Sequence, residues 1–148
     1  MGLVVAAPLA GTAVALAEVP DPVFADAVVG PGLAVVPDET SRVAAAPIAG
    51  TLVKLKPHAF VVAEGSRAVL VHLGIDTVSL GGDGFRLLAE QGQEVAAGDP
   101  VVRWDPAEVT RRGLSAVCPV VALEAPADAV VTPARGRIAA GDPLFTWV

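Results

Sequence analysis

Two histidines, His58 and His72, are the residues of this chain whose type and spacing could do chemistry, and both lie in one apolar stretch, 58–78. A neutral imidazole, with a reference pKa of about 6.5, is a competent nucleophile at cytosolic pH. A second imidazole beside it could donate a hydrogen bond to an anionic group that arrives on the first. The alternative is one partly buried histidine and one surface histidine that share no site.

The stretch that contains the histidines has the pattern of a β-hairpin. Apolar and β-branched residues flank the polar turn 64–67,. A three-residue loop, 64–66, pairs His58 with His72, and directly opposed residues on antiparallel strands share a face. A two-residue loop sets His58 against Leu73 and sends the two histidines to opposite faces. The glycine in the turn favours the three-residue loop, so we expect the two imidazoles to touch.

Length and charge restrict the class of protein. The 148 residues fit one domain, 1–148, with one core,. A net charge of −6, with ten thinly scattered basic residues, excludes the electrostatic footprint of a nucleic-acid-binding protein,. The most apolar segment, Met1–Val19, is broken by Pro8, Gly11 and Thr12, so it reads neither as a signal peptide nor as a membrane-spanning helix,.

Internal repeats are the strongest sign of how the chain is organised. Ala7–Leu16 recurs as Ala46–Leu55, and Ala96–Trp104 recurs as Ala139–Trp147. Each unit is a glycine turn that leads into a short apolar strand. Two such pairs are too few and too dissimilar for a solenoid. They predict an all-β protein with duplicated strand motifs, an antiparallel β-sandwich or flattened barrel.

Helical periodicity is weak, and we expect one or two short helices and no third. Prolines recur through the first half of the chain and exclude long helices there,. Residues Gly84–Gln91 could form one or two turns. Residues Pro106–Leu114 are the better candidate, because Asp105 can cap the helix and Pro106 suits its first position.

The histidine stretch resembles a known family. Val71–Val78, read as VHLGIDTV, is similar to the phosphorylation-site signature of the IIA component, glucose family, of the bacterial sugar phosphotransferase system. His58-Ala-Phe60 resembles the second active-site histidine of that family. Further similar signatures follow in the same order and cover nearly the whole chain: Ala7–Gly11, Val19–Phe24, Gly30–Ala34, Ala46–Thr51, Gly84-Phe85 and Glu90–Val95.

The resemblance implies a cytoplasmic phosphocarrier. His72 accepts a phosphoryl group from the phosphohistidine of the carrier protein HPr and passes it to the cysteine of a IIB domain, which phosphorylates the sugar during uptake. His58 hydrogen-bonds the phosphoryl group and steadies its charge. No cofactor is implied, in agreement with the absence of a nucleotide-binding glycine loop from the sequence,. The sugar is not identified, because specificity belongs to the membrane IIC domain.

The resemblance also implies an exposed apolar depression around His72, to which both partners dock. The depression and its acidic rim are formed by Val23, Phe24, Leu70 and Val78, with Asp21 and Asp76 at the rim facing basic residues of the donor. The alternative for the four apolar residues is ordinary core packing. For the two aspartates it is a structural role in turns.

Two features depart from the family or need a separate interpretation. The family usually carries a Thr-Asn pair before the supporting histidine, whereas Lys56-Pro57 stands here in a shorter connection. Lys56 could offer a charge to the phosphoryl group, or it could be an ordinary solvated lysine. Cys118, the single cysteine, excludes an internal disulfide and suits a reducing cytosol. Its apolar neighbours predict a buried, inert thiol and not a phosphoryl acceptor.

Three rival functions belong to other classes. A biotinyl or lipoyl carrier needs a lysine at a hairpin tip, where this chain has 64–67. A zinc peptidase usually has three protein ligands, and the chain has no third histidine, although an acidic residue could complete the set or zinc could bind across a partner interface. The third rival is a regulator that binds permeases or kinases according to its phosphorylation state, and this role can coexist with that of the carrier.

Overall fold

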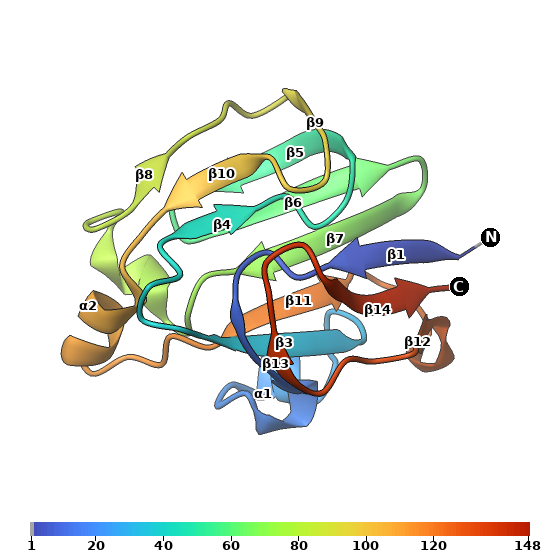
Figure 1. The fold of residues 1–148 in the computed structure, drawn as a ribbon, viewed down its shortest axis with the longest axis horizontal. Coiled ribbons are helices and arrows are strands. Elements are labelled where there is room, and N and C mark those ends of the chain that lie inside the picture. Colours follow the sequence, from blue (N-terminus) through green and yellow to red (C-terminus); the bar gives the residue numbers. More distant parts are fainter. Residues whose placement is uncertain (1) are drawn as a thin grey trace.

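The structure, a computed structural model, describes residues 2–148 and consists mainly of antiparallel strands (Figure 1). One sheet has eight strands, in the spatial order β13 (Gly136–Ile138), β2 (Gly11–Ala15), β3 (Gly32–Pro37), β11 (Cys118–Ala122), β7 (Arg67–His72), β6 (Ala59–Glu64), β5 (Gly50–Lys56) and β9 (Glu94–Val95). Two sheets have three strands each, in the orders β1 (Leu3–Ala6), β14 (Pro143–Trp147), β12 (Val130–Val131) and β4 (Val43–Ala45), β10 (Pro100–Arg103), β8 (Arg86–Leu87).

The main hydrophobic core lies between the eight-stranded sheet and the two small sheets. Phe60, Val71 and Val120 of the large sheet belong to one buried cluster with Val102 of β10 and Phe145 of β14. Figure 1 shows β4, β10, β1 and β14 in front of the large sheet. Fully burying one such side chain contributes about 1.5–3 kcal/mol, so this layer dominates the stability of the fold. The expected all-β sandwich or flattened barrel is confirmed.

A smaller cluster lies on the opposite face of the eight-stranded sheet. It is formed by Leu16, Val19, Phe24, Ala34, Ile75, Val117 and Val121, with Leu70 packed against it. Because successive side chains of a strand alternate between faces, β7 directs Val71 into the main core and Leu70 toward this second cluster. The segments η1 (Leu16–Glu18) and α1 (Pro22–Ala25) supply part of its cover.

The first sequence repeat forms two equivalent corners of the sandwich. The copies bond to each other reciprocally, since the Ala45 amide donates to the Pro8 carbonyl at 2.8 Å and the Ala6 amide to the Pro47 carbonyl at 2.9 Å. Each copy then starts a strand at a glycine, β2 at Gly11 and β5 at Gly50. A Cβ atom at either glycine would overlap a carbonyl oxygen of the neighbouring strand. The repeat found in the sequence is therefore also a repeat of the structure.

The second repeat forms equivalent turns. The carboxylates of Asp99 and Asp142 accept hydrogen bonds from the amides of Ala96 and Ala139, both at 2.9 Å. Aspartate side chains stabilise turns by bonding nearby backbone amides in this way. The turns lead into β10 and β14, which pair with β4 and β1 in the two small sheets. The two repeats thus place equivalent strands in two separate sheets.

One of the expected helices is confirmed. Helix α2 (Pro106–Arg111) has Pro106 at its first position, and the Asp105 carboxylate accepts hydrogen bonds from the Ala107 and Glu108 amides. The helix ends before Leu114, because Gly113 takes a φ of +84°, the left-handed conformation that terminates helices,. No helix within residues 2–148 has the length and apolar character needed to cross a bilayer.

The other helix lies in a different place from the one expected. The prediction of helical turns at Gly84–Gln91 is wrong, because Arg86–Leu87 forms β8 and pairs with β10. The second helix is α1, which Asp21 caps by accepting from the Val23 amide and which Pro22 begins. The remaining short elements are the 3₁₀-helices η2 (Thr77–Leu80) and η3 (Ala127–Ala129).

Candidate functional site

The hairpin β6–β7 carries His72 at the end of its second strand. Its register pairs Glu64 with Arg67 and Ala59 with His72, so the turn has two residues, Gly65-Ser66. The prediction of a three-residue loop that pairs the two histidines is therefore wrong. Gly65 takes a φ of +59°, and a positive φ at the first loop position is what the favoured two-residue hairpin turns require,.

The two imidazoles nevertheless meet. His58 lies opposite Leu73, whose amide donates to the His58 carbonyl at 2.7 Å. Yet His58 belongs to the turn that joins β5 to β6, and not to a strand. The alternation of side chains between the two faces of a sheet therefore does not determine where its side chain points,. The ring centroids of His58 and His72 are 5.3 Å apart, with the rings at 69°. The expected contact between the two imidazoles is present, but it results from the turn at Pro57-His58 and not from strand register.

A second ring, from the connection that follows β2, confines His72. The ring of Phe24 lies 5.2 Å from that of His72, measured between centroids, at a tilt of 55°. Phe24 is held there by α1, whose first turn is fixed by Asp21 and Pro22. The imidazole of His72 therefore contacts an aromatic ring of one connection and an imidazole of another.

The tautomer of His72 follows from its backbone partner. Its Nδ1 lies 2.6 Å from the carbonyl oxygen of Gly74. Because a carbonyl can only accept, Nδ1 carries the proton and Nε2 keeps its lone pair for a nucleophilic reaction. The segment is held in shape by the Thr77 hydroxyl, which donates to the Leu73 carbonyl at 2.7 Å. Gly74 itself takes a φ of +78°, and a Cβ atom there would overlap the Thr77 side chain and the Ser115 carbonyl oxygen.

The electrostatic surroundings keep both imidazoles neutral near pH 7. Burial lowers the pKa of His72, against the Gly74 carbonyl and the charges of Asp21 and Asp76, which raise it,. Burial also lowers the pKa of His58, and the charges of His72 and Lys56 lower it further. A neutral imidazole is the form that can act as a nucleophile.

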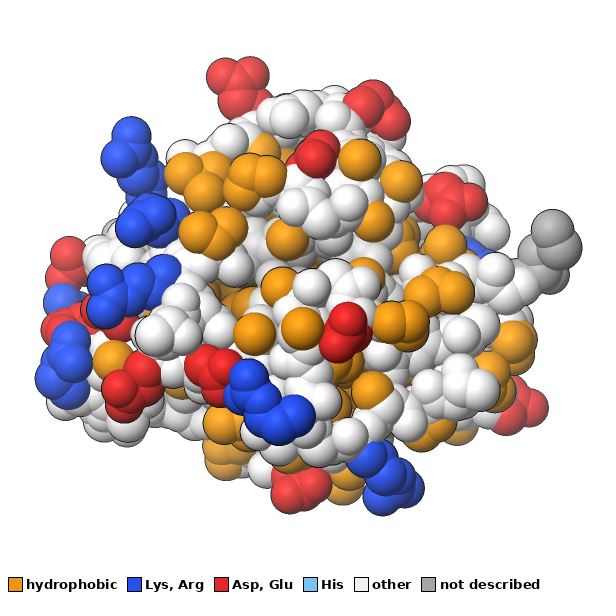
Figure 2. Space-filling view, viewed as in Figure 1, with side chains coloured by type: hydrophobic (Ala, Val, Ile, Leu, Met, Phe, Trp, Pro, Cys, Tyr) orange, Lys and Arg blue, Asp and Glu red, His pale blue; other side chains and the backbone are white. Residues whose placement is uncertain are grey.

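The residues expected at the docking surface differ in exposure. Val23 and Val78 are 44% and 63% exposed, whereas Phe24 is 7% exposed and belongs to the second cluster with Leu70 packed against it. Phe24 and Leu70 therefore also have the core role that was the alternative for them. The face shown in Figure 2 displays no histidine side chain.

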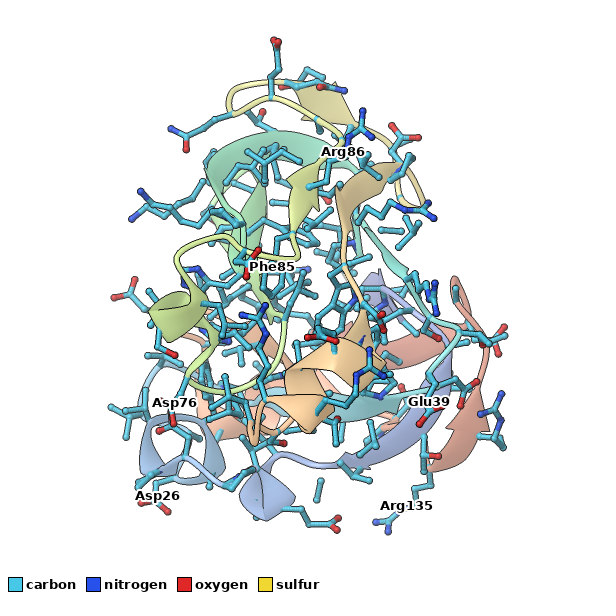
Figure 3. The ribbon with its side chains drawn as sticks, turned by 90° about the vertical axis from the view of Figure 1, so that its left-hand side faces the viewer. Asp26, Glu39, Asp76, Phe85, Arg86 and Arg135 are labelled. Atoms are coloured by element: carbon cyan, nitrogen blue, oxygen red, sulfur yellow. The ribbon has the colours of Figure 1, made fainter. Side chains whose placement is uncertain are left out.

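Both aspartates combine a backbone role with an electrostatic one. The Asp21 carboxylate caps α1. Asp76 is exposed and adopts a left-handed φ of 61°, and its carbonyl oxygen accepts from the Ser79 hydroxyl at 2.7 Å. Figure 3 shows Asp76 beside the segment of α1, where Asp26 is labelled. Since both charges act on His72, these residues form an acidic edge next to the imidazole.

Sequence reasoning did not identify the supporting roles of Gly74 and Thr77. Both lie inside the histidine stretch, and a glycine two residues after a histidine was the available signal. Cys118 is buried as expected, and burial raises the pKa of its thiol to about 12. Within residues 2–148 no group of three or more histidine, cysteine, aspartate or glutamate side chains is arranged to hold a metal ion.

Known proteins with similar sequences include separate and fused chains. The glucose-specific EIIA component of Staphylococcus aureus strain COL is 39% identical over 118 residues, which cover 78% of this chain and 70% of that protein. The glucose-specific EIIBCA component of Corynebacterium glutamicum is 42% identical over 122 residues, 82% of this chain and 18% of that protein. The N-acetylglucosamine-specific EIICBA component of Escherichia coli K12 is 40% identical over 143 residues, which cover 93% of this chain and 22% of that protein. The chain thus spans about a fifth of the length of these fused relatives.

A solved structure has nearly the same fold. Glucose permease IIA from Mycoplasma capricolum superposes with a TM-score of 0.91 at 35% identity, covering 99% of this chain and 96% of that one. The family model described as phosphoenolpyruvate-dependent sugar phosphotransferase system, EIIA 1, matches residues 3–128. With most of its length matched in sequence and nearly all of it in fold, this chain belongs to the EIIA 1 family of the sugar phosphotransferase system.

Proposed function

We propose that this protein is a phosphocarrier that accepts a phosphoryl group on His72 from the phosphohistidine of HPr and passes it to the cysteine of a IIB domain during sugar uptake. The observation that carries the proposal is the arrangement of His72. Its Nδ1 faces the Gly74 carbonyl, its Nε2 keeps a lone pair, and His58 lies beside it. Membership of the EIIA 1 family supports this role.

The transfer requires one bond to form and one to break. The lone pair of His72 Nε2 attacks the phosphorus, and the electron pair of the donor's phosphorus–nitrogen bond returns to the donor imidazole. Delivery to the acceptor reverses these roles, with a cysteine thiolate as the attacking group. The phosphoryl oxygens carry the charge throughout, so positioning and electrostatic stabilisation are the protein's main contributions.

His58 is proposed to stabilise the phosphoryl group and not to accept it. Its ring lies 5.3 Å from that of His72 between centroids, which places a polar nitrogen within reach of a group bound there. Its lowered pKa keeps it neutral near pH 7, and a neutral imidazole still has one N–H to donate,. A hydrogen bond from His58 to a phosphoryl oxygen would strengthen as charge develops in the transition state.

The partner surface is proposed to surround His72. Val23 and Val78 supply exposed apolar area, Phe24 and Leu70 support it from beneath, and the acidic edge of Asp21 and Asp76 would meet basic side chains of HPr,. The names of the fused relatives combine EIIA with EIIB and EIIC, which supports a IIB domain as the acceptor. A relay between HPr and IIB places this domain in the cytoplasm.

Intact-mass measurement tests the proposal. The protein is incubated with phosphoenolpyruvate, enzyme I and HPr, and the wild type is compared with His72→Ala and His58→Gln. The wild type should gain one acid-labile phosphoryl group, His72→Ala should gain none, and His58→Gln should be labelled but transfer poorly to a IIB domain. Equal labelling of His72→Ala and the wild type would overturn the assignment of the acceptor.

A further inference from the structure

The chain has two lysines, and both lie on one strand near the histidine pair. Eight of its ten basic residues are arginines, whereas Lys54 and Lys56 are in β5. Lys56 is the last residue of that strand and is exposed to solvent. It directly precedes Pro57 and His58, which form the turn into β6. The ammonium group of Lys56 is thus tethered beside the connection that presents His58.

The register of the large sheet places Lys56 in one row with His72. Lys56 pairs with Ala59 across β5 and β6, and Ala59 pairs with His72 across β6 and β7. Paired residues on antiparallel strands share a face, so all three side chains leave the sheet on the same side. Two strand spacings separate the backbones of Lys56 and His72 by about 9–10 Å.

The neighbouring row of paired residues shows which face of the large sheet carries Lys56 and His72. Leu55, Phe60 and Val71 are paired in the same manner, and all three are buried in the main core. Because side chains alternate along each strand, the row of Lys56 must face away from that core. It faces the side on which His72 contacts Phe24.

Alanine in the middle of the row leaves room for the lysine to extend. Ala59 has no atom beyond Cβ, so the four-carbon stem of Lys56 can lie across it toward His72. A larger residue at this position would occupy that path. The charge of Lys56 already acts on the site, because it contributes to the lowered pKa of His58. The acidic edge of Asp21 and Asp76 acts on His72 with the opposite sign.

A phosphoryl group on His72 would add negative charge close to two carboxylates. A nearby cation offsets such charge, and lysine binds phosphoryl oxygens as a point charge. We propose that the ammonium group of Lys56 extends over Ala59 and contacts the phosphoryl oxygens on His72, acting as a catalytic residue for the transfer. This inference rests on the proposed phosphocarrier function and adds to it a cation supplied by the shortened connection.

Lys56 takes no part in the bond changes. Only the phosphorus–nitrogen bonds exchange, and the transfer moves no proton to or from Lys56. Its contribution is to offset the charge of the phosphoryl group, both while that group rests on His72 and in the transition state. Arginine at the same position would keep the charge, and glutamine would remove it while preserving much of the stem.

Single-turnover transfer from phosphorylated HPr tests this role in Lys56→Gln, Lys56→Arg and a matched control, Lys54→Gln. Lys54 lies on the same strand and face but in the row of Val61 and Leu70. At saturating donor the rate should fall about 10-fold in Lys56→Gln, less than the loss from deleting a buried oxyanion donor, because Lys56 is exposed. It should fall less than about 2-fold in Lys56→Arg and in Lys54→Gln.

The phosphorus NMR titration of phosphorylated protein supplies a readout that a merely structural role would not move. Loss of a nearby cation should raise the pKa of the phosphoryl group in Lys56→Gln and leave it unchanged in Lys54→Gln. Equal rates and equal titration curves in Lys56→Gln and the wild type would overturn the inference, as would equal losses at both lysines. If instead the wild type is not phosphorylated at all, the proposed function itself fails.

Discussion

The two copies of the first repeat start alike and end differently. Both begin a strand at a crowded glycine and both form the same corner of the sandwich. After β2 the chain runs through residues 16–31, with η1 and α1, before it enters β3. After β5 it turns back within two residues, Pro57 and His58. The duplicated part builds the scaffold, and the parts that differ supply the side chains around His72.

Each connection contributes a different kind of group. The long one brings the apolar ring of Phe24 and the carboxylate of Asp21, which respectively confine His72 and raise its pKa. The short one brings an imidazole, His58, and directly follows a cation, Lys56, at the end of β5. A connection of 16 residues, 16–31, can form its own small cluster against the sheet. A two-residue turn can only present what lies directly on it.

The largest expected effect is a difference in the free energy of unfolding between variants of the two connections. Phe24→Ala removes the main ring of the second cluster and should lower the free energy of unfolding by about 3 kcal/mol,. Pro57→Ala should cost at most about 1 kcal/mol, because it acts mainly on the backbone freedom of a half-buried two-residue turn,. Urea denaturation measures both. The contrast fails if Pro57→Ala costs as much as Phe24→Ala.

Substitution of the repeat glycines tests whether the shared corners are equivalent. Gly11→Ala and Gly50→Ala each force a Cβ atom onto a carbonyl oxygen, and each should lower the free energy of unfolding by about 2 kcal/mol,. Gly65→Ala, at a position with open space, is the control and should cost about 1 kcal/mol for its positive φ,. Markedly unequal losses at Gly11 and Gly50 would show that the corners are not equivalent.

Acid should destabilise the fold through the histidine pair. Both pKa values are lowered in the folded protein, so the unfolded chain binds more protons below its own pKa of about 6.5,. The corresponding stability is complete above that pH and declines as the pH falls through the lowered values. Urea denaturation between pH 7.5 and pH 5.5 should show this decline in the wild type. A double variant, His58→Gln with His72→Gln, that keeps the whole decline would refute the explanation.

The smallest effect concerns the acidic edge. Asp21→Asn in the long connection and Asp76→Asn after β7 each remove a charge that raises the pKa of His72, so each should lower that pKa slightly. Proton NMR titration of the imidazole measures the change, which should shrink at high salt because these charges are partly exposed. A rise in the pKa of His72 in either variant would contradict the sign of the interaction.

Repetition and capping made part of this structure predictable from sequence. The repeated glycine and aspartate turns identified the duplicated strands, and Asp105-Pro106 identified α2. Asp21-Pro22 is the same signal and marks α1, although its neighbouring prolines hid it. Residues 84–91 were wrongly predicted to form helical turns, because the two-residue strand β8 is too short to show a periodic pattern. Its partner β10 determines that conformation.

The site shows where pattern reasoning reaches its limit. The pairing of β6 with β7 was predictable, but the loop length was not, because Gly65 suits turns of either length. The contact between His58 and His72 then depended on a turn outside the strand register. Lys56 became informative only when the register placed it in line with Ala59 and His72. Cross-strand neighbours of this kind are set by tertiary pairing and not by local sequence.

The hydrogen bond between His72 Nδ1 and the Gly74 carbonyl affects how easily a phosphoryl group on His72 leaves. If Nε2 takes up phosphorus while Nδ1 keeps its proton, the ring becomes a cationic leaving group from the moment it is loaded. Departure then needs no proton from water, and turnover in heavy water should proceed at nearly the ordinary speed. One backbone oxygen would thereby keep the carried group both attached and ready for release.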